Sequence, residues 1–359
     1  MKPSVLRRLV GLFAKHNCHE AVSYALLRRL LAQRIAGENA RWLNHFLGSA
    51  MPVLTQPPLP EVCAILNKLP NAREGSQDGL CPQDLALLNE LFSSDKKAQG
   101  IFYTPWATAV HLAEETLFSV LTHQAGLPTP TAQALVLGKK APLTAQQAQQ
   151  AERCLRGLTV CDPAAGAGGL LVPFALALLA LRKTLTPSLE EGQMLQEIVE
   201  QNLFAADISS AALDDLQLRF ALLLAQKGQT PTGKVVLPHV FWGDALGEKS
   251  GNSVLCKAFA SVFEQKGGFD VILSNPPYVG QKNHRAVFEK LRQNPLWKDY
   301  CQPKSDLLYF FFYLTLDLLK EGGIGSFITT SYFASAAGAQ SLRTRLKQET
   351  ALLFLEDFG

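Results

Sequence analysis

Residues 269–278 read FDVILSNPPY, a short apolar run that ends in an amide, two prolines and a tyrosine. Val271, Ile272 and Leu273 have the length and the composition of a central strand in a parallel sheet. Because proline lacks the N–H group that a strand ladder needs, we expect this strand to end at Asn275. Ligands of open α/β sheets bind at the carboxyl ends of the strands. The stretch therefore predicts a ligand-facing turn at that edge of a sheet.

Around this strand, apolar runs of strand length alternate with helical segments, which is the pattern of a doubly wound α/β sheet. Strands are expected at residues 158–161, 203–206, 235–241, 271–274, 324–329 and 352–357. Three helical patterns precede these strands, at residues 5–15, 18–35 and 39–47. A proline-rich break and a further helix follow the three patterns. We therefore predict an N-terminal helical domain over residues 1–95 and an α/β domain over residues 96–359.

The composition is typical of a globular chain. Of the 359 residues, 47% are hydrophobic and 18% are charged, which argues against a disordered protein. The longest apolar stretches, such as residues 170–181, are too short to span a bilayer, and the N-terminus lacks the pattern of a signal peptide. Seven scattered cysteines without a CxxC pair indicate reduced thiols. We expect a cytoplasmic protein with no membrane partner and no metal site.

The net charge is only +3, but the basic residues are unevenly distributed. Residues 1–48 carry eight basic and two acidic side chains, and residues 281–304 carry six basic and two acidic ones. A solvated surface accounts for the first cluster as well as a charged partner does. The second cluster directly follows the NPPY turn, and there we favour contact with the phosphates of a nucleic acid.

Acidic residues follow successive predicted strands. Asp162 begins the stretch DPAAGAGG, in which Gly166 and Gly168 allow close approach of a ligand to the backbone and to the N–H groups of the next helix. The spacing differs from a dinucleotide fingerprint, because Leu171 stands where the third glycine would be and the next strand-end acid, Asp207, lies 39 residues after Gly168. This arrangement suits a nucleoside that is held without a pyrophosphate.

The two later acids have separate candidate roles. Asp207 can accept hydrogen bonds from both hydroxyls of a ribose; a cap of the following helix is the structural alternative for an aspartate at such a turn. Asp244 is placed to accept the amino group of an adenine ring, which Ala245 and Leu246 can flank. The nearby Trp242 is expected in the core. Three acids that each follow one of three successive strands are stronger evidence for a nucleoside site than any one of them.

Taken in order, the motifs resemble those of amino-methyltransferases that use S-adenosylmethionine, in the γ arrangement of the adenine-N6 DNA methyltransferases. FYTP at residues 102–105 matches the cofactor-tail motif of that family, although on its spacing alone it is an ordinary helix start. DPAAGAGG matches the glycine loop, and SNPPY matches the catalytic [DNS]PP[YFW] motif. The stretch from residue 304 to residue 333 resembles the segment that follows in type IIG restriction–modification and phage-defence enzymes.

The resemblance implies a mixed seven-stranded Rossmann-like sheet, S-adenosylmethionine as the cofactor and double-stranded DNA as the substrate. It assigns cofactor binding to Tyr103, Thr104, Pro105, Asp162, Ala164, Gly166, Gly168, Asp207, Ile208, Asp244, Ala245 and Asn275. It assigns catalysis to Asn275, Pro276, Pro277 and Tyr278.

The NPPY residues suit the chemistry of an adenine amine, which is a poor nucleophile because its lone pair is delocalised into the ring. The Asn275 side-chain oxygen and the Pro276 carbonyl can accept its two hydrogens and direct the lone pair at a sulfonium methyl group. The two prolines make the turn rigid, and Tyr278 offers a stacking face to a base that has rotated out of the duplex. A tight turn without a catalytic role is the structural alternative.

Two features of that family have no counterpart in the sequence. These are the aromatic residue that follows the strand ending in LEDFG and the C-terminal target recognition domain. We therefore expect either a fragment of a longer polypeptide or a subunit that needs a specificity partner. No PD…(D/E)xK cluster is present in the N-terminal region, so nuclease activity is not predicted.

Other functions remain open on the sequence alone. Methyltransferases that modify a glutamine of release factors share a stretch like FDVILSNPPYV, but their glycine loop reads DLGTGSG and they lack FYTP. An RNA amino-methyltransferase is a weaker alternative. A DNA-binding subunit that keeps the fold without turnover is the alternative from a different class, although Asn275, Tyr278 and all three acids are intact.

Overall fold

The computed structural model describes residues 31–32, 104–229, 236–237, 239–249, 251–282 and 284–358. The predicted N-terminal helical domain lies outside these ranges, apart from Leu31 and Ala32, which are helical and buried. The predicted cofactor residue Tyr103 also lies outside them. The boundary between residues 95 and 96 therefore stays a prediction.

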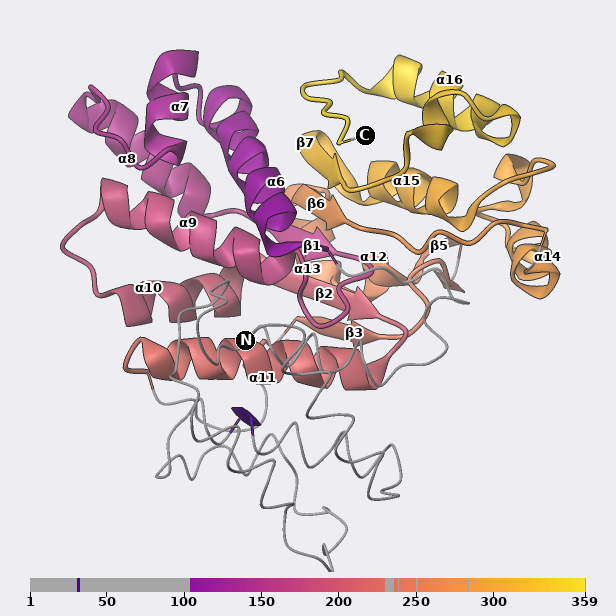
Figure 1. The fold of residues 1–359 in the computed structure, drawn as a ribbon, viewed down its shortest axis with the longest axis horizontal. Coiled ribbons are helices and arrows are strands. Elements are labelled where there is room, and N and C mark those ends of the chain that lie inside the picture. Colours follow the sequence, from indigo (N-terminus) through magenta and orange to yellow (C-terminus); the bar gives the residue numbers. More distant parts are fainter. Residues whose placement is uncertain are drawn as a thin grey trace, which may run out of the picture.

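Five parallel strands form one sheet in the described part of the chain, in the order β3–β2–β1–β6–β7 (Figure 1). They are β1 (Val160–Asp162), β2 (Leu203–Asp207), β3 (Val240–Trp242), β6 (Phe269–Ser274) and β7 (Leu319–Phe327). Every residue of β6 is buried, which explains why its sequence is a continuous apolar run and not an alternation. The predicted doubly wound α/β fold is confirmed.

Helices cover both faces of the sheet and form two hydrophobic cores (Figure 1). The first core is built with α6 (Trp106–Ser119), α7 (Thr129–Val136), α8 (Ala145–Arg156), α9 (Leu171–Leu185), α10 (Glu191–Glu197) and α11 (Ser210–Gln226). The second is built with α12 (Val254–Ala258), α13 (Ala260–Lys266), α14 (Arg285–Gln293), α15 (Leu307–Leu318) and α16 (Gln340–Glu349). Val271 and Leu273 of β6 face the first core and Ile272 faces the second, as the alternation of side chains along a strand requires. No helix in the described ranges is long and apolar enough to cross a membrane.

Short elements connect these helices and strands. Two π-helical segments, η1 (Val120–Gln124) and η2 (Ile198–Asn202), extend α6 and α10. Three turns of 3-10 helix are η3 (Lys298–Tyr300), η4 (Ser331–Ala334) and η5 (Ala337–Ala339). The strands β4 (Glu248–Lys249) and β5 (Asn252–Ser253) pair with each other in an antiparallel ladder apart from the main sheet.

The strand predicted at residues 352–357 is not formed. This segment is exposed and pairs with no strand among the described residues. It lies against α6, where His111 contacts the carboxylate of Glu356 at 2.6 Å and the ring of Phe354. A strand needs a neighbour to complete its ladder, and an apolar pattern alone does not supply one. The described sheet consequently has five parallel strands, and the mixed seven-stranded sheet that the family resemblance implied is not observed.

Candidate functional site

The predicted site residues that the structure describes gather at one edge of the sheet. Asp162 and Asp207 are the last residues of β1 and β2, and Asn275 directly follows β6. Because all five strands run in the same direction, their carboxyl ends meet at this edge (Figure 1). The order of the strands along the chain reverses between β1 and β6, which is the position where open α/β sheets bind ligands.

The glycine loop that follows β1 has a conformation that requires glycine. Gly166 and Gly168 have φ angles of 53° and 82°, values that residues with a Cβ atom rarely adopt. A Cβ at Gly168 would also lie only 2.4 Å from the side chain of Leu216. Among the described residues, apart from its neighbours in the chain, no atom lies within 4 Å of the Cβ position of Gly166.

Arg219, which the sequence analysis did not single out, holds the glycine loop by hydrogen bonds to its backbone. Arg219 lies on α11 and is buried. Its guanidinium donates hydrogen bonds to the carbonyl oxygens of Ala167 at 2.8 Å and Gly168 at 3.1 Å. The only signal in the sequence is a lone basic residue in the apolar run LQLRFALLL. We infer that Arg219 stabilises the shape of the loop and does not touch a ligand.

Asp207 connects the loops that follow β1 and β2. One carboxylate oxygen accepts the backbone N–H of Gly166 at 2.8 Å, and the other accepts the N–H of Ser209 at 2.8 Å. The side chain of Ser209, not that of Asp207, caps α11 by accepting the N–H of Ala212. Asp207 therefore does not act as the helix cap that the sequence left as an alternative role.

Asp162 is a buried carboxylate with a strongly shifted pKa. Its side chain is 1% exposed, and one of its oxygens accepts the backbone N–H of Ala164 at 3.0 Å. Burial raises the pKa of Asp162 to about 8; the hydrogen bond from Ala164 opposes this shift and the charge of Asp207 adds to it. No cationic side chain of the described residues pairs with this carboxylate. A cationic ligand would supply the missing partner.

The third acid lies beyond β3, at the edge of the sheet. Asp244 is exposed and accepts the backbone N–H of Leu246 at 3.0 Å, while Ala245 is buried. Ile208 and Trp242 are 71% and 69% exposed, and the indole N–H of Trp242 donates to the carbonyl of Ile208 at 3.1 Å. The expectation that Trp242 belongs to the core is wrong, because β3 is an edge strand and no described element covers this side chain.

The NPPY turn holds the Asn275 side chain between two hydroxyl groups. The amide nitrogen of Asn275 donates to the Thr104 hydroxyl at 2.8 Å, and the Tyr278 hydroxyl donates to the amide oxygen at 2.9 Å. The Tyr278 hydroxyl also lies 3.0 Å from the carbonyl of Ile328, which follows β7. Pro276 is buried, and Pro277 and Tyr278 are half-buried. The amide thus lies at the ligand-binding edge and not in the core.

Asp306 and Ser305 support the segment that follows the NPPY turn, and the sequence analysis did not predict these contacts. Asp306 caps α15 by accepting the N–H of Leu308 at 3.1 Å, and the same oxygen accepts the N–H of Val279 at 3.1 Å. The backbone of Gln281 donates to the carbonyl of Ser305 at 3.1 Å. Burial and the charge of Asp306 raise the pKa of Tyr278 to about 12, so the tyrosine stays a neutral phenol.

Thr104 and Pro105 lie just before α6, which begins at Trp106. Thr104 is buried, and Pro105 is exposed. The Thr104 hydroxyl oxygen lies 3.9 Å from the Cβ position of Gly169 in the glycine loop. Thr104 therefore lies between the glycine loop and the NPPY turn.

Residues 201–359 match the Eco57I restriction-modification methylase family. This match confirms the predicted resemblance to restriction–modification methyltransferases, and the matched range includes Asp207, Asp244 and the NPPY residues. Thr104, Asp162 and the glycine loop precede the matched range, so their roles depend on the geometry described above.

Two curated relatives come from Haemophilus influenzae. Type II methyltransferase M.HincII is 37% identical over 91 residues, which make up 25% of this chain and 18% of the relative. Type II methyltransferase M.HindII is 37% identical over 91 residues, 25% of this chain and 17% of the relative. The matched stretch thus spans less than a fifth of either relative.

Solved structures with the same fold include two restriction–modification enzymes. The type IIL enzyme MmeI in complex with DNA is similar with a TM-score of 0.51 and 15% identity, over 88% of this chain and 48% of that one. A nuclease-deletion mutant of the type ISP enzyme LlaGI, in complex with a DNA substrate mimic, has a TM-score of 0.50 and 13% identity, over 91% of this chain and 26% of that one. At these identities the likeness shows the fold.

Proposed function

We propose that the chain is part of a cytoplasmic enzyme that transfers a methyl group from S-adenosylmethionine to the N6 amine of an adenine flipped out of double-stranded DNA. This is the activity of a site-specific, adenine-specific DNA methyltransferase in a restriction–modification or phage-defence system. The observation that carries the proposal is the Asn275 amide, which follows β6 at the ligand-binding edge of the sheet and is held at its two ends by the hydroxyls of Thr104 and Tyr278. The match to a restriction-modification methylase family supports it.

The residues at this edge fit S-adenosylmethionine, which has an ammonium group, a sulfonium group and an adenosine. Asp162 is buried without a cationic partner among the described residues and would hold a positive charge of the cofactor. No described residue beyond its chain neighbours approaches the Cβ position of Gly166 within 4 Å, which is compatible with a ligand at this point of the loop. Asp207 would accept the ribose hydroxyls, and the exposed Asp244 would accept the amino group of the cofactor adenine. When bound, the cofactor supplies an electrophilic methyl group.

The NPPY residues would activate the substrate amine. The Asn275 side-chain oxygen has two lone pairs, so it can accept a hydrogen of the amine while it keeps the hydrogen bond from Tyr278. The Pro276 carbonyl would accept the second hydrogen. Both acceptors together would draw the nitrogen toward tetrahedral geometry and direct its lone pair at the methyl group that the bound cofactor would supply. After the transfer, the nitrogen would give its extra proton to water.

Glutamine amides pose the same chemical problem as adenine amines, so the substrate must be tested directly. Labelled S-adenosylmethionine should be offered with unmethylated duplex DNA, release factor and RNA in parallel, with any specificity partner or recognition domain of the full polypeptide present. We expect label in DNA, recovered as N6-methyladenine. Label in the release factor alone would overturn the DNA assignment. Binding of cofactor and DNA without transfer would identify a non-catalytic subunit.

The basic stretch that follows the NPPY turn is the proposed contact with DNA phosphates. Its exposed cations are Lys282, Arg285, Lys290, Arg292, Lys298 and Lys304. Within the described residues, Arg292 alone of these pairs with a carboxylate, that of Glu289. Two contacts hold the stretch in place: Gln281 accepts the backbone N–H of Lys304, which joins its two ends, and the indole of Trp297 donates to the carbonyl of Leu246 at 2.6 Å. The second contact attaches the stretch to the loop of Asp244.

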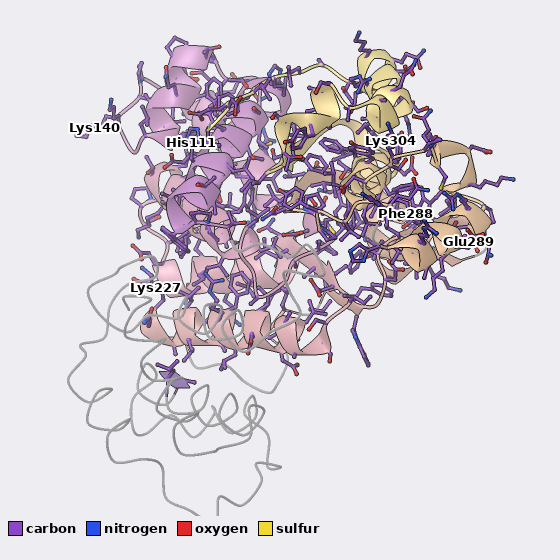
Figure 2. All side chains as sticks on the ribbon, turned by 45° about the vertical axis from the view of Figure 1, so that its right-hand side comes forward. His111, Lys140, Lys227, Phe288, Glu289 and Lys304 are labelled. Atoms are coloured by element: carbon purple, nitrogen blue, oxygen red, sulfur yellow. The ribbon has the colours of Figure 1, made fainter. Side chains whose placement is uncertain are left out.

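Neutralising three of these cations should weaken DNA binding and its salt dependence. In a Lys290→Gln/Lys298→Gln/Lys304→Gln variant, the slope of log affinity against log salt concentration should fall by up to ~0.9 for each phosphate contact that is lost. Binding to duplexes of arbitrary sequence, titrated between about 50 and 200 mM salt, measures this slope. A Lys139→Gln/Lys140→Gln variant, which removes two cations, is the control for the loss of charge and is compared per charge removed, because both lysines are exposed and Lys140 lies on the opposite side of the domain from Lys304 (Figure 2). Equal slopes in the two variants would exclude this surface as the phosphate contact.

A further inference from the structure

Tyr332 is a large aromatic residue that lies exposed near the NPPY turn. It belongs to η4, in the segment that follows β7, and its side chain is 73% exposed. The chain passes directly beside the turn before it reaches η4, because the backbone N–H of Ile328 donates to the carbonyl of Ser274 at 3.0 Å and the Ile328 carbonyl lies 3.0 Å from the Tyr278 hydroxyl. Three residues separate Ile328 from Tyr332, so their Cα atoms are at most ~14 Å apart.

The turn that carries Tyr332 is held in place by its neighbours. The ring of the next residue, Phe333, packs against Phe312 of the second core with ring centroids 5.3 Å apart. The guanidinium of Arg343 donates to the carbonyls of Phe333 at 3.0 Å and Ala336 at 2.7 Å. The backbone N–H of Ala336 donates in turn to the carbonyl of Tyr332 at 2.8 Å. The backbone is thus fixed while the aromatic side chain faces water.

The same surface includes a cation of the basic stretch. The side chain of Gln302 donates to the Ser341 hydroxyl at 2.6 Å, which joins the loop of the exposed Lys304 to the helix that follows η4 and η5. The backbone N–H of Gln281 donates to the carbonyl of Ser305 at 3.1 Å, which joins that loop to the segment after the NPPY turn. Cations that hold the backbone, together with aromatic rings on which bases stack, are typical of surfaces that bind unpaired nucleotides.

We propose that Tyr332 stacks on a nucleobase that loses its pairing when the target adenine leaves the duplex. This role rests on the proposed function and extends it by a second contact with a base. A flipped adenine has two faces, and the ring of Tyr278 can cover only one of them. The base on the opposite strand also loses its partner when the adenine leaves. Either base has a face to which the exposed ring of Tyr332 offers a stacking partner.

Equilibrium binding of Tyr332 variants to DNA tests this role. The probe is the duplex in which labelled transfer locates the methylated adenine, bound to the full polypeptide with S-adenosylhomocysteine so that no transfer occurs. Tyr332→Ala should weaken binding by ~5- to 100-fold, the contribution of stacking one base on an aromatic side chain. The fold should be unaffected because the side chain is exposed. Tyr332→Phe keeps the ring and should bind like the wild type.

Two modified duplexes identify the base that Tyr332 contacts. The first has an abasic site in place of the target adenine, and the second has an abasic site opposite it. If Tyr332 stacks on the target adenine, Tyr332→Ala and the wild type should bind the first duplex equally; if it stacks on the opposite base, they should bind the second duplex equally. An undiminished difference on both duplexes would place Tyr332 against paired DNA or phosphates and overturn the proposal.

A control variant removes another exposed apolar side chain. Leu137 is 53% exposed and lies three residues before Lys140, on the opposite side of the domain from Lys304 (Figure 2). Leu137→Ala should bind DNA like the wild type, and an equal loss in both alanine variants would refute a specific role for Tyr332. Label in DNA together with unchanged affinity of Tyr332→Ala would overturn this role alone. Absence of label in DNA would overturn the proposed function and this role with it.

Discussion

Replacing Asn275 with alanine is expected to lower methyl transfer by ~10²- to 10³-fold, the effect of removing one preorganised hydrogen-bonding group from an active site. The variant lacks the side-chain oxygen that would accept one amine hydrogen, and the Pro276 carbonyl alone cannot hold the amine in the reactive geometry. The Tyr278 and Thr104 hydroxyls also lose their shared partner. Single-turnover transfer to DNA measures the loss, because it separates the chemical step from product release.

Cofactor binding and a conservative substitution define the role more sharply. The affinity of Asn275→Ala for S-adenosylhomocysteine should stay within ~3-fold of that of the wild type, which corresponds to less than ~1 kcal/mol. Asn275→Asp keeps one acceptor oxygen in place and should retain more transfer than the alanine variant. If the alanine variant lost cofactor affinity and transfer to the same extent, Asn275 would be a cofactor residue and not a residue that activates the amine.

The site residues that could be predicted are those whose signals lie close together in the sequence. Asp162 and Asp207 end β1 and β2, and Asn275 follows β6. Each lies where an apolar run meets a turn, and parallel strands carry such residues to one edge of the sheet without further information. The sequence predicted this edge because the signals for strand, turn and acid all lie within a few residues of one another.

Contacts between distant segments could not be predicted in the same way. The hydrogen bond from Asn275 to Thr104 and the hydrogen bonds from Arg219 to the glycine loop depend on how α6 and α11 pack against the sheet. The absent strand at residues 352–357 has the same cause, because an apolar pattern predicts a strand but only a neighbouring ladder forms one. The prediction that Trp242 lies in the core was wrong because β3 is an edge strand, and the sequence alone does not give the position of a strand within the sheet.

Asp162 is predicted to reduce the stability of the ligand-free protein at neutral pH. The folded protein holds a proton on this carboxyl up to a pKa of about 8, whereas the ordinary value is 3.8. Between these values the folded state binds more protons than the unfolded state, so the free energy of unfolding falls as the pH rises. A pKa difference of one corresponds to ~1.4 kcal/mol. The free energy of unfolding therefore falls by at most on the order of 5 kcal/mol as the pH rises from the ordinary pKa to the raised one.

Asp162→Asn should remove this loss. An amide does not titrate, so the free energy of unfolding of the variant, relative to that of the wild type, should rise by several kcal/mol between about pH 4 and pH 8. Urea denaturation across that range measures the difference, because titrations of the other groups cancel between the two proteins. Asp244→Asn is the matched control, since it makes the same substitution at an exposed carboxylate. Parallel curves for wild type and Asp162→Asn would contradict the shifted pKa.

The same substitution should weaken the cofactor by ~100-fold or more, because a buried cation that loses its partner costs ~3–5 kcal/mol. In the wild-type protein, affinity for S-adenosylhomocysteine should rise toward pH 8, since binding its ammonium group requires the ionised form of Asp162. Affinity for 5′-methylthioadenosine, which has no ammonium group, should depend far less on pH. Calorimetric titration of both ligands against both proteins distinguishes a charge partner from a purely structural aspartate. An ammonium-dependent pH profile that survives in Asp162→Asn would assign the charge contact to another residue.

The combination of higher stability and lost cofactor affinity in one variant would show that the buried carboxylate is retained for binding at the expense of the fold.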